Sequence, residues 1–244
     1  MKIFGHRGAK GESPENTIAG LRHSIDRGVT QVEIDLRLSL DKKIVIVHDD
    51  NALRTTGLKQ PINRLSARDL KKLDARKSSL NWSHKSNCGI PELKEVLKKC
   101  PEITKYQLEV KTEKIRDCDT IINELIKIFP NKKTAEKIIV TSFNSYILEK
   151  LSKIAPYISR GLVSDQRNAL RKAKSLNCNM VCIDHRIATR SWTKQIKDSG
   201  IATSFWTVNN PSLIEEYFKW GVDSIITDYP SMALPLSKRL ELKS

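Results

Sequence analysis

No stretch of this sequence is apolar for long enough to cross a lipid bilayer. A membrane-spanning helix needs about 18 or more consecutive apolar residues, and no such run occurs in the 244 residues. The N-terminus also lacks the apolar segment of a signal peptide, because strand-like residues follow Met1 almost at once. We therefore expect neither a signal peptide nor a stable membrane anchor.

The sequence also lacks the cysteine patterns of disulfide frameworks and zinc sites. It contains five cysteines, an odd number, and no two of them form a C-x-x-C pair. Cys178 and Cys182 could both bind a metal, but no neighbouring Cys/His pair completes a set of zinc ligands. The pattern favours reduced thiols and therefore a cytoplasmic protein.

Acidic residues are scarce relative to basic ones. The chain has 43 lysines and arginines against 28 aspartates and glutamates, which gives a formal net charge of +15. Such a charge is compatible with binding to nucleic acid or to an anionic membrane surface. The lysines are spread along the chain, however, which is more typical of a solvated surface that also attracts an anionic substrate. We expect no nucleic-acid partner and keep a basic binding protein as a remote alternative.

What the sequence does contain is a regular alternation of strand and helix patterns. Strands are expected near residues 3–4, 31–36, 44–47, 106–111, 138–140, 159–163, 180–183, 202–208 and 224–226. Helices are expected near residues 15–28, 66–73, 91–99, 119–129, 145–154, 165–176, 190–199 and 211–219. This alternation predicts an α/β fold with a parallel sheet. A closed (β/α)8 barrel is the leading arrangement at this length, and a doubly wound open sheet is the second.

The patterns supply about nine candidate strands where a barrel needs eight. One strand must therefore lie outside the barrel, and the patterns do not identify it. Residues 50–90 have too few apolar residues for a core of their own. We expect one domain over residues 1–244, with a small insertion at about 50–90 on the active-site side.

The first expected strand leads directly into a loop with reactive side chains. His6 can exchange protons near neutral pH, and Arg7 beside it can bind a phosphate with its planar guanidinium. Ser13 is suited to cap the following helix, with Pro14 as its first residue. The order is therefore strand, catalytic loop, helix.

Further polar side chains recur near the C-terminal ends of the expected strands. They are His6, Arg7, Glu33, Asp35, His48, Asp49, Glu109, Lys111, Ser142, Asn209 and Asp228. In a parallel barrel these strand ends gather on one face, where active sites are built.

Three of these residues have the chemistry of a metal site. Glu33 and Asp35 are two apart on one strand, as are Glu109 and Lys111 on another, so both members of each pair face the same way. Three carboxylates gathered inside a barrel repel one another unless a cation lies among them. Oxygen ligands of this kind suit Mg²⁺ or Ca²⁺. Alternation on an exposed strand would produce the same spacing, but the repeated pattern favours a site.

Two histidines and two cations complete a set suited to phosphodiester cleavage. His6 and His48 could move protons, while Arg7 and Lys111 could stabilise the charge that develops on the phosphate. Trp206 either contributes to the pocket or packs against a neighbouring loop at its rim.

A series of short motifs runs nearly from end to end of the chain. They are His6-Arg7-Gly8, Pro14-Glu15-Asn16-Thr17, Glu33-Ile34-Asp35, His48-Asp49, Arg54-Thr55-Thr56, Leu73-Asp74-Ala75, Ile90-Pro91, Glu109-Val110-Lys111, Ser142-Phe143, Trp206-Thr207-Val208-Asn209 and Gly221-Val222-Asp223 through Asp228. In this order the motifs resemble those of the glycerophosphodiester phosphodiesterases, which are related to the phosphatidylinositol-specific phospholipase C-like barrels. Ala52 and Arg76 depart from the family pattern, as does the short insertion, and they affect the outer wall of the pocket.

The resemblance implies a (β/α)8 barrel with a small insertion after the second histidine motif. It implies metal ligation by Glu33, Asp35 and Glu109, and acid–base catalysis by His6 and His48. Further, it implies that Arg7 and Lys111 hold the phosphate, and that water or, more in keeping with the family, the neighbouring glycerol hydroxyl attacks it. Trp206 is expected to contact the substrate.

The implied reaction is hydrolysis of a small-molecule glycerophosphodiester to glycerol 3-phosphate and an alcohol, with Mg²⁺ or Ca²⁺ as cofactor. A lysophospholipase D acting on lysophospholipids is the alternative within the same fold, although no hydrophobic ramp is evident in the sequence. The alcohol that leaves and the oligomeric state, monomer or dimer, are left open at this point.

Overall fold

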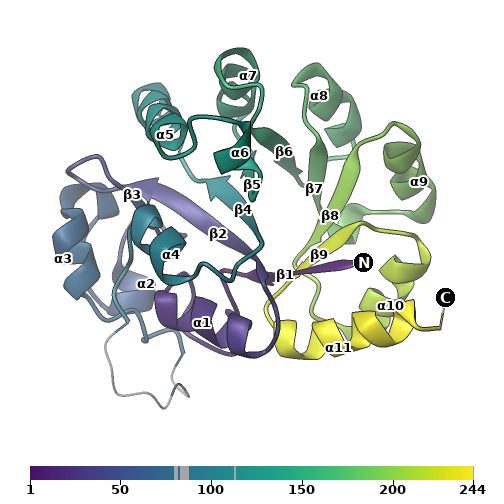
Figure 1. The fold of residues 1–244 in the computed structure, drawn as a ribbon, viewed down its shortest axis with the longest axis horizontal. Helices are drawn as coiled ribbons and strands as arrows, with labels where there is room; N and C mark the ends of the chain where they lie inside the picture. The colour runs from purple at the N-terminus through teal and green to yellow at the C-terminus, as the bar shows by residue number, and fades with distance from the viewer. Residues whose placement is uncertain (80–81, 83–87, 113, 244) are drawn as a thin grey trace.

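A closed barrel of parallel strands forms the centre of the computed structural model, which describes residues 1–79, 82, 88–112 and 114–243 (Figure 1). The parallel strands are β1 (Lys2–His6), β2 (Gln31–Leu38), β4 (Lys105–Val110), β5 (Ile138–Ser142), β6 (Ser159–Ser164), β7 (Met180–Asp184), β8 (Ala202–Trp206) and β9 (Ser224–Thr227). Strand β1 pairs with β9 on one side and with β2 on the other, which closes the sheet. The (β/α)8 barrel that the sequence predicts is thus confirmed, and the open sheet is excluded.

The strand outside the barrel is β3 (Ile44–Ile46), which pairs antiparallel with β2. The reason is the length of the connection, since residues 39–43 permit only a hairpin and a parallel pair needs a crossover of about a dozen residues. The Val47 amide donates to the carbonyl of Asp35. The returning strand therefore brings His48 close to Asp35 on β2.

Helices surround the barrel and bury its outer face (Figure 1). They are α1 (Ile18–Asp26), α4 (Leu93–Lys99), α5 (Ile115–Ile128), α6 (Lys132–Ala135), α7 (Ser145–Ile154), α8 (Ala169–Ser175), α9 (Arg190–Asp198), α10 (Pro211–Lys219) and α11 (Pro230–Glu241), with a 3₁₀ turn η2 (His185–Ile187) after β7. Helix α11 brings Glu241 to the N-terminus, where its carboxylate lies 2.7 Å from the Met1 amino group. The N-terminus and the C-terminal helix are thereby joined.

The start of α1 differs from the expectation that Ser13 caps a helix beginning at Pro14. The cap is Thr17, whose hydroxyl accepts from the Gly20 amide at 3.0 Å. The Ser13 hydroxyl instead donates to the carbonyl of Ala9, within a buried turn. The residues before Thr17 are therefore free to fold back toward the barrel mouth.

The core lies between the barrel and the helices, in two large clusters. One joins β2, β4 and β5 to α4, α5 and α7, and the other joins the strands from β6 to β9 to the helices from α8 to α11. Leu108, Leu125 and Leu151 are fully buried in the first cluster, and each contributes about 1.5–3 kcal/mol of hydrophobic burial. This rigid shell holds the strand ends in place.

The segment at residues 50–90 contains α2 (Leu53–Thr56), the 3₁₀ turn η1 (Ile62–Arg64) and α3 (Ala67–Lys72). Its apolar residues form a small cluster with Val45 and Val47, next to β3. The loop expected at residues 76–89 falls partly outside the described residues. Among the residues that the structure describes, no helix is long and apolar enough to cross a membrane.

Candidate active site

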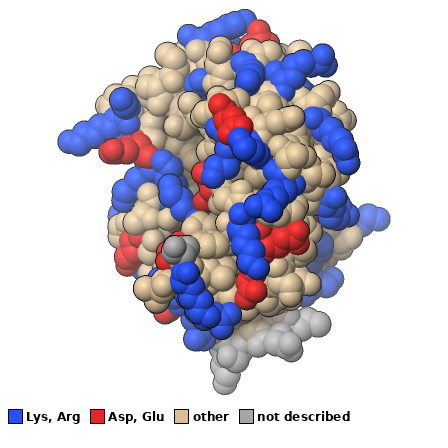
Figure 2. All heavy atoms as spheres, turned by 90° about the vertical axis from the view of Figure 1, so that its right-hand side faces the viewer, with Lys and Arg blue, Asp and Glu red and all other residues tan. Residues whose placement is uncertain are grey.

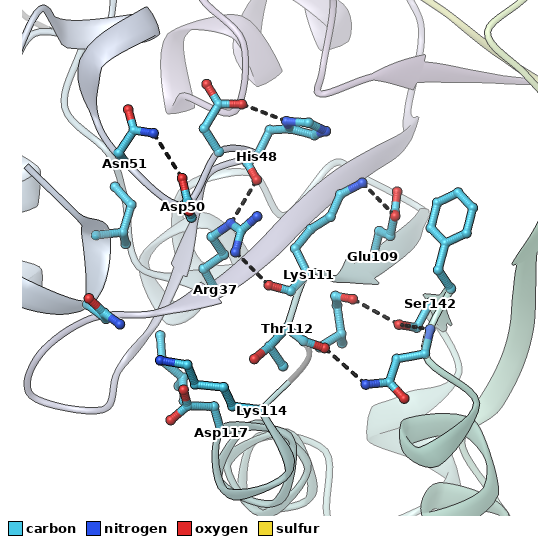
Figure 3. Close-up of a pocket in the computed structure, with 17 residues that line it drawn as sticks. Arg37, His48, Asp50, Asn51, Glu109, Lys111, Thr112, Lys114, Asp117 and Ser142 are labelled. Carbon is cyan, nitrogen blue, oxygen red and sulfur yellow. Dashed lines mark hydrogen bonds and ion pairs between the residues drawn. The ribbon is translucent and has the colours of Figure 1, made fainter. Parts of the chain in front are cut away.

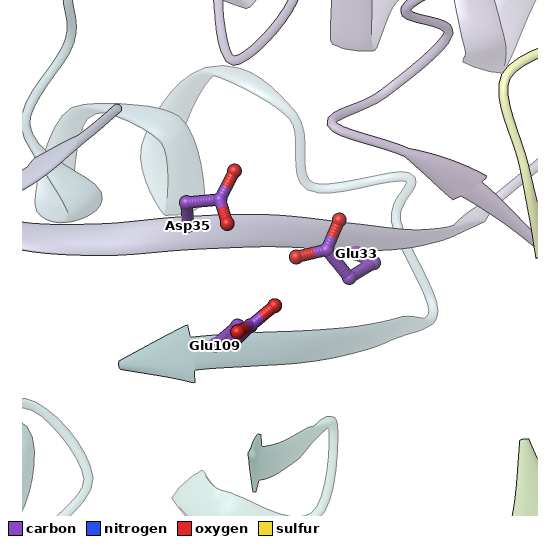
Figure 4. Close-up of side chains that lie close together, drawn as sticks. All are labelled: Glu33, Asp35 and Glu109. Carbon is purple, nitrogen blue, oxygen red and sulfur yellow. The ribbon is translucent and has the colours of Figure 1, made fainter. Parts of the chain in front are cut away.

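The three carboxylates of the expected metal site meet at the C-terminal mouth of the barrel. Figure 4 shows Glu33 and Asp35 extending from β2 toward Glu109 on β4. Asp35 and Glu109 are partners in the parallel register. All three side chains are buried, and one ligand oxygen from each lies within 4.8 Å of the others. The pattern of alternate residues therefore does place them on one inner face.

The charges of these carboxylates fit a divalent cation. Burial raises the pKa of Glu33 well above its ordinary value, and neighbouring Asp35 and Glu109 raise it further. Burial also raises the pKa of Glu109, although the Lys111 ammonium opposes this. The Glu33 Oε1 atom has no hydrogen-bond partner among the described residues. A buried carboxylate oxygen without a partner is costly unless a cation binds it.

Asp35, in contrast, is held in its ionised form by the protein. Burial alone would raise its pKa, but the Arg7 guanidinium and the Lys111 ammonium outweigh that effect and lower it to about 2. The Arg7 Nε and Lys111 Nζ atoms lie 3.2 and 3.5 Å from its carboxylate. Asn16 donates a hydrogen bond of 2.8 Å to the same group.

His6 ends β1 and is oriented by a carboxylate from the other end of the chain. Its Nδ1 lies 2.6 Å from the Asp228 carboxylate, and its Nε2 lies 3.8 Å from Glu33 Oε2. Burial lowers the pKa of His6, even though Asp228 raises it. Burial opposes ionisation of Asp228, but the hydrogen bond to His6 lowers its pKa to about 2. An ionised Asp228 carboxylate can only accept a hydrogen bond, so the neutral ring of His6 carries its proton on Nδ1 and can accept another at Nε2.

His48 follows β3 and is oriented in a similar way. Its Nδ1 lies 2.8 Å from the Asp49 carboxylate, which also accepts from Arg54 Nε at 2.7 Å. Burial lowers the pKa of His48, and the negative charge of Asp35 opposes this. His6 and His48 line the same pocket.

The two cations are fixed by buried acids. The Lys111 Nζ lies 2.6 Å from Glu109 Oε1, and the Arg7 guanidinium donates to Glu15 at 2.8 Å. Burial opposes both positive charges, yet the neighbouring carboxylates raise the pKa of Arg7 and that of Lys111. Both side chains are therefore charged at any physiological pH.

Gly5 allows the chain to turn sharply into this loop. A Cβ atom at this position would lie 1.9 Å from the carbonyl oxygen of Gly8. Any other residue would push apart the backbone that carries His6 and Arg7.

Trp206, for which a place in the pocket and a packing role at its rim were both open, lines the pocket. It does so with Thr207 and Phe143, and its ring meets Phe143 edge-on at 5.9 Å between centroids. Ser142 instead stabilises the backbone, since its hydroxyl donates to the Val110 carbonyl and accepts from the Asn144 amide.

Sequence reasoning missed one functional residue and left another without a role. Glu15 is buried and accepts from both Arg7 and Arg54, at 2.8 Å and at 2.6–2.8 Å. Its place in the motif that follows His6-Arg7 was the available signal. Asp228 stood at a strand end, but its contact with His6 spans 222 positions of sequence and leaves no local signal.

The comparisons with known proteins decide the family. The model of the glycerophosphoryl diester phosphodiesterase family matches residues 6–232. The chain belongs to this family. The resemblance and the expectation of a phosphodiesterase are thereby confirmed, and the matched range spans all the site residues described above.

Relatives within the family are similar over their full length. A glycerophosphodiester phosphodiesterase of Caldanaerobacter subterraneus is 30% identical over 246 residues, which cover 97% of this chain and 98% of the relative. A putative glycerophosphodiester phosphodiesterase of Bacillus subtilis is 29% identical, with 96% and 97% covered. The solved structure of an Oleispira antarctica phosphodiesterase in complex with the product sn-glycerol-3-phosphate has a TM-score of 0.86 and 25% identity, covering 98% of this chain and 97% of that one.

Proposed function

We propose that this protein hydrolyses glycerophosphodiesters to glycerol 3-phosphate and an alcohol, with a divalent cation and two histidines. The observation that carries the proposal is the single pocket at the barrel mouth that holds both histidines, both cations and two of the three carboxylates. The Oleispira relative binds sn-glycerol-3-phosphate as its product, which supports the same product here. We further propose that residues 1–244 act as one barrel domain on a small-molecule substrate.

Glu33, Asp35 and Glu109 would hold the cation, Mg²⁺ or Ca²⁺. When bound, such an ion would act as a Lewis acid and stabilise the negative charge that develops in the reaction. The raised pKa of Glu33 and its unpaired Oε1 support this role. Arg7 and Lys111 would hold the remaining phosphate oxygens, since both are charged and line the pocket.

The histidines would move protons in two steps. In the first, His6 Nε2 takes the proton of the neighbouring glycerol hydroxyl, whose oxygen bonds to phosphorus, while His48 gives a proton to the departing alcohol oxygen. A cyclic phosphate results. In the second, His48 takes a proton from water, the water oxygen bonds to phosphorus, and His6 returns its proton to the ring oxygen that leaves. Both histidines regain their starting states, as microscopic reversibility requires.

A substrate with p-nitrophenol as leaving group separates the two roles, because p-nitrophenolate needs little protonation. Each histidine is expected to contribute about 10²–10⁴-fold to the natural reaction. His48→Ala should regain most of its activity on the p-nitrophenyl ester, while His6→Ala should remain poor. Rescue of His6→Ala instead would reverse the assignment, and undiminished activity of both variants would place the site elsewhere.

Lysophospholipase D activity is the second candidate. It is favoured by a human relative named as a lysophospholipase D, which is 24% identical and covers 95% of this chain and 83% of the relative. Lysophosphatidylcholine and glycerophosphocholine share the choline ester, so their kcat/KM ratio measures the preference directly. We expect glycerophosphocholine to be the better substrate of the two, since charged groups surround the pocket.

A further inference from the structure

A second, larger pocket opens beside the catalytic one. Its volume is about 940 Å³, against about 240 Å³ for the catalytic pocket. The two share His48, Glu109, Lys111 and Phe143, so they lie next to each other at the barrel mouth. Binding sites for small molecules span roughly 300–1,000 Å³. The catalytic pocket thus suits glycerol phosphate alone, and the larger one has room for a sizeable second group.

The position of His48 indicates which part of the substrate enters the larger pocket. This step rests on the proposed function, in which His48 protonates the departing alcohol. His48 and Asp49 both line the larger pocket, whereas His6 and Trp206 line the catalytic pocket and not the larger one. The leaving oxygen at His48 therefore faces the larger pocket, and the glycerol faces Trp206.

The wall of the larger pocket is fixed in place by Arg37. Its guanidinium donates to the carbonyls of His48 and Lys111, at 2.7 and 2.8 Å, and Figure 3 shows it between these two segments. Arg37 thus ties the segment that follows β3 to the segment that follows β4. A fixed wall favours selection among alcohols by shape.

The lining combines hydrogen-bond donors with acceptors. Asn63, Thr112 and Lys114 have side chains without a hydrogen-bond or ion-pair partner in the described part of the chain, and all three line the pocket. Among the described residues, the Asp50 carboxylate accepts a hydrogen bond from Asn51 alone, at Oδ1. Donors and acceptors in this mixture suit hydroxyl groups, each of which can donate and accept.

Other classes of alcohol fit the lining less well. An acyl chain needs a wall of apolar side chains, whereas most residues that line this pocket are charged or polar, and the aliphatic ones, Leu38, Ile62 and Val110, are largely buried. A quaternary ammonium group is usually recognised by a cage of aromatic rings. Among the described residues of this lining, Phe143 is the one Phe, Tyr or Trp, and the Lys111 ammonium already lies 5.9 Å from its ring.

We infer that the larger pocket is the subsite for the leaving alcohol and that it selects a bulky, neutral alcohol rich in hydroxyl groups, such as a cyclic polyol. The wild-type enzyme should then hydrolyse glycerophosphoinositol with a kcat/KM about tenfold above that for glycerophosphoethanolamine, by the hydrogen bonds that only the polyol makes. Equal values, or a preference for the ethanolamine or choline ester, would overturn the inference.

A filled pocket provides the second test. Asn63→Phe places a large ring in the subsite, and the ratio of kcat/KM for the inositol ester to that for the ethanolamine ester should fall about tenfold. Asn123→Phe is the matched control, because Asn123 is exposed on α5 and lines neither pocket. A ratio unchanged by Asn63→Phe would exclude the subsite. Wild-type enzyme that hydrolysed none of these esters would instead overturn the proposed function itself.

Discussion

At Glu33, burial and two neighbouring carboxylates oppose ionisation, so the stability of the protein should depend on pH when no cation is bound. A carboxyl group whose pKa is raised in the folded state binds its proton more tightly than in the unfolded chain. Its stabilising contribution is present below the unfolded value of 4.5 and is lost as pH rises through the higher folded value. Asp35 acts in a separate window, from 3.8 down to about 2, where its contribution is lost as pH falls.

We therefore expect the melting temperature of chelated enzyme to fall as pH rises above 4.5, and added Mg²⁺ or Ca²⁺ to restore it. Glu33→Gln should weaken this pH dependence and reduce the stabilisation by the cation, while the fold persists. Calorimetry with chelator and with each cation measures both effects. Undiminished hydrolysis after exhaustive chelation would contradict the metal site, and collapse of Glu33→Gln would indicate a structural ion.

The contact of Asp228 with His6 predicts a shift in the pH profile. Asp228 raises the pKa of His6 against the larger, opposite effect of burial. Asp228→Asn should lower that pKa further, so the acidic limb of kcat/KM should move to lower pH. The rate should also fall about 10–100-fold, as is common when a supporting hydrogen bond is lost. If the acidic limb of the kcat/KM profile moved to higher pH instead, the titration of a group other than His6 would control that limb.

At the scale of secondary-structure elements, α2 connects the insertion to both halves of the site. Arg54 on this short helix binds Glu15 and Asp49, and these carboxylates in turn contact Arg7 and His48. Arg54→Ala should lower kcat more than it raises KM, because it releases Asp49, which contacts His48, the proposed proton donor. Arg54→Lys should recover only part of kcat, since an ammonium cannot reproduce the forked contact with Glu15.

The matched control for this prediction is Arg64→Ala. Arg64 lies in η1 of the same insertion, is exposed, and has no ion-pair or side-chain hydrogen-bond partner in the residues that the structure describes. Its replacement should leave kcat unchanged. Equal losses from both arginines would mean that general destabilisation of the insertion, and not the orientation of Asp49, lowers the rate.

The elements also show where sequence reasoning succeeds and where it fails. The alternation of polar and apolar residues identified the strand at 31–36, because successive side chains of a strand point to opposite faces of the sheet. The same reasoning did not identify β3 as the peripheral strand, since apolar β-branched residues suit a parallel or an antiparallel partner equally. The cap at Thr17 was missed because Ser13 is intrinsically as good a cap, and only the tertiary turn decides between them.

At the scale of the whole molecule, barrel closure determines which distant residues meet. The parallel pairing of β1 with both β2 and β9 brings His6 to Glu33 on one side and to Asp228 on the other. The sequence predicts which side chains lie at the end of each strand. Which of these side chains come into contact depends on the order of the strands around the barrel. The assignment of strand ends to one face was therefore predictable, and the pairing of Asp228 with His6 was not.

The excess of basic residues can also be tested on the whole molecule. Figure 2 shows lysine and arginine side chains spread over the visible face, with acidic residues among them. A phosphodiester is anionic, so the net charge of +15 should raise its rate of encounter, and this effect should weaken with salt. We expect the kcat/KM of wild-type enzyme to fall moderately as ionic strength rises.

Substitution of single basic residues distinguishes the effect of charges in the pocket from the effect of the net charge of the protein. Arg7→Ala and Lys111→Ala should each lower kcat/KM about 10²–10³-fold at every salt concentration, since each removes a cation that binds the phosphate in the proposed reaction. Lys132→Ser and Lys133→Ser, on the exposed helix α6, should change only the salt dependence. Steady-state kinetics across ionic strengths distinguish the two classes, because screening acts on distant exposed charges and far less on buried pairs. Similar losses from all four variants would mean that the electrostatic field of the whole protein governs catalysis. Arg7 and Lys111 would then have no special role.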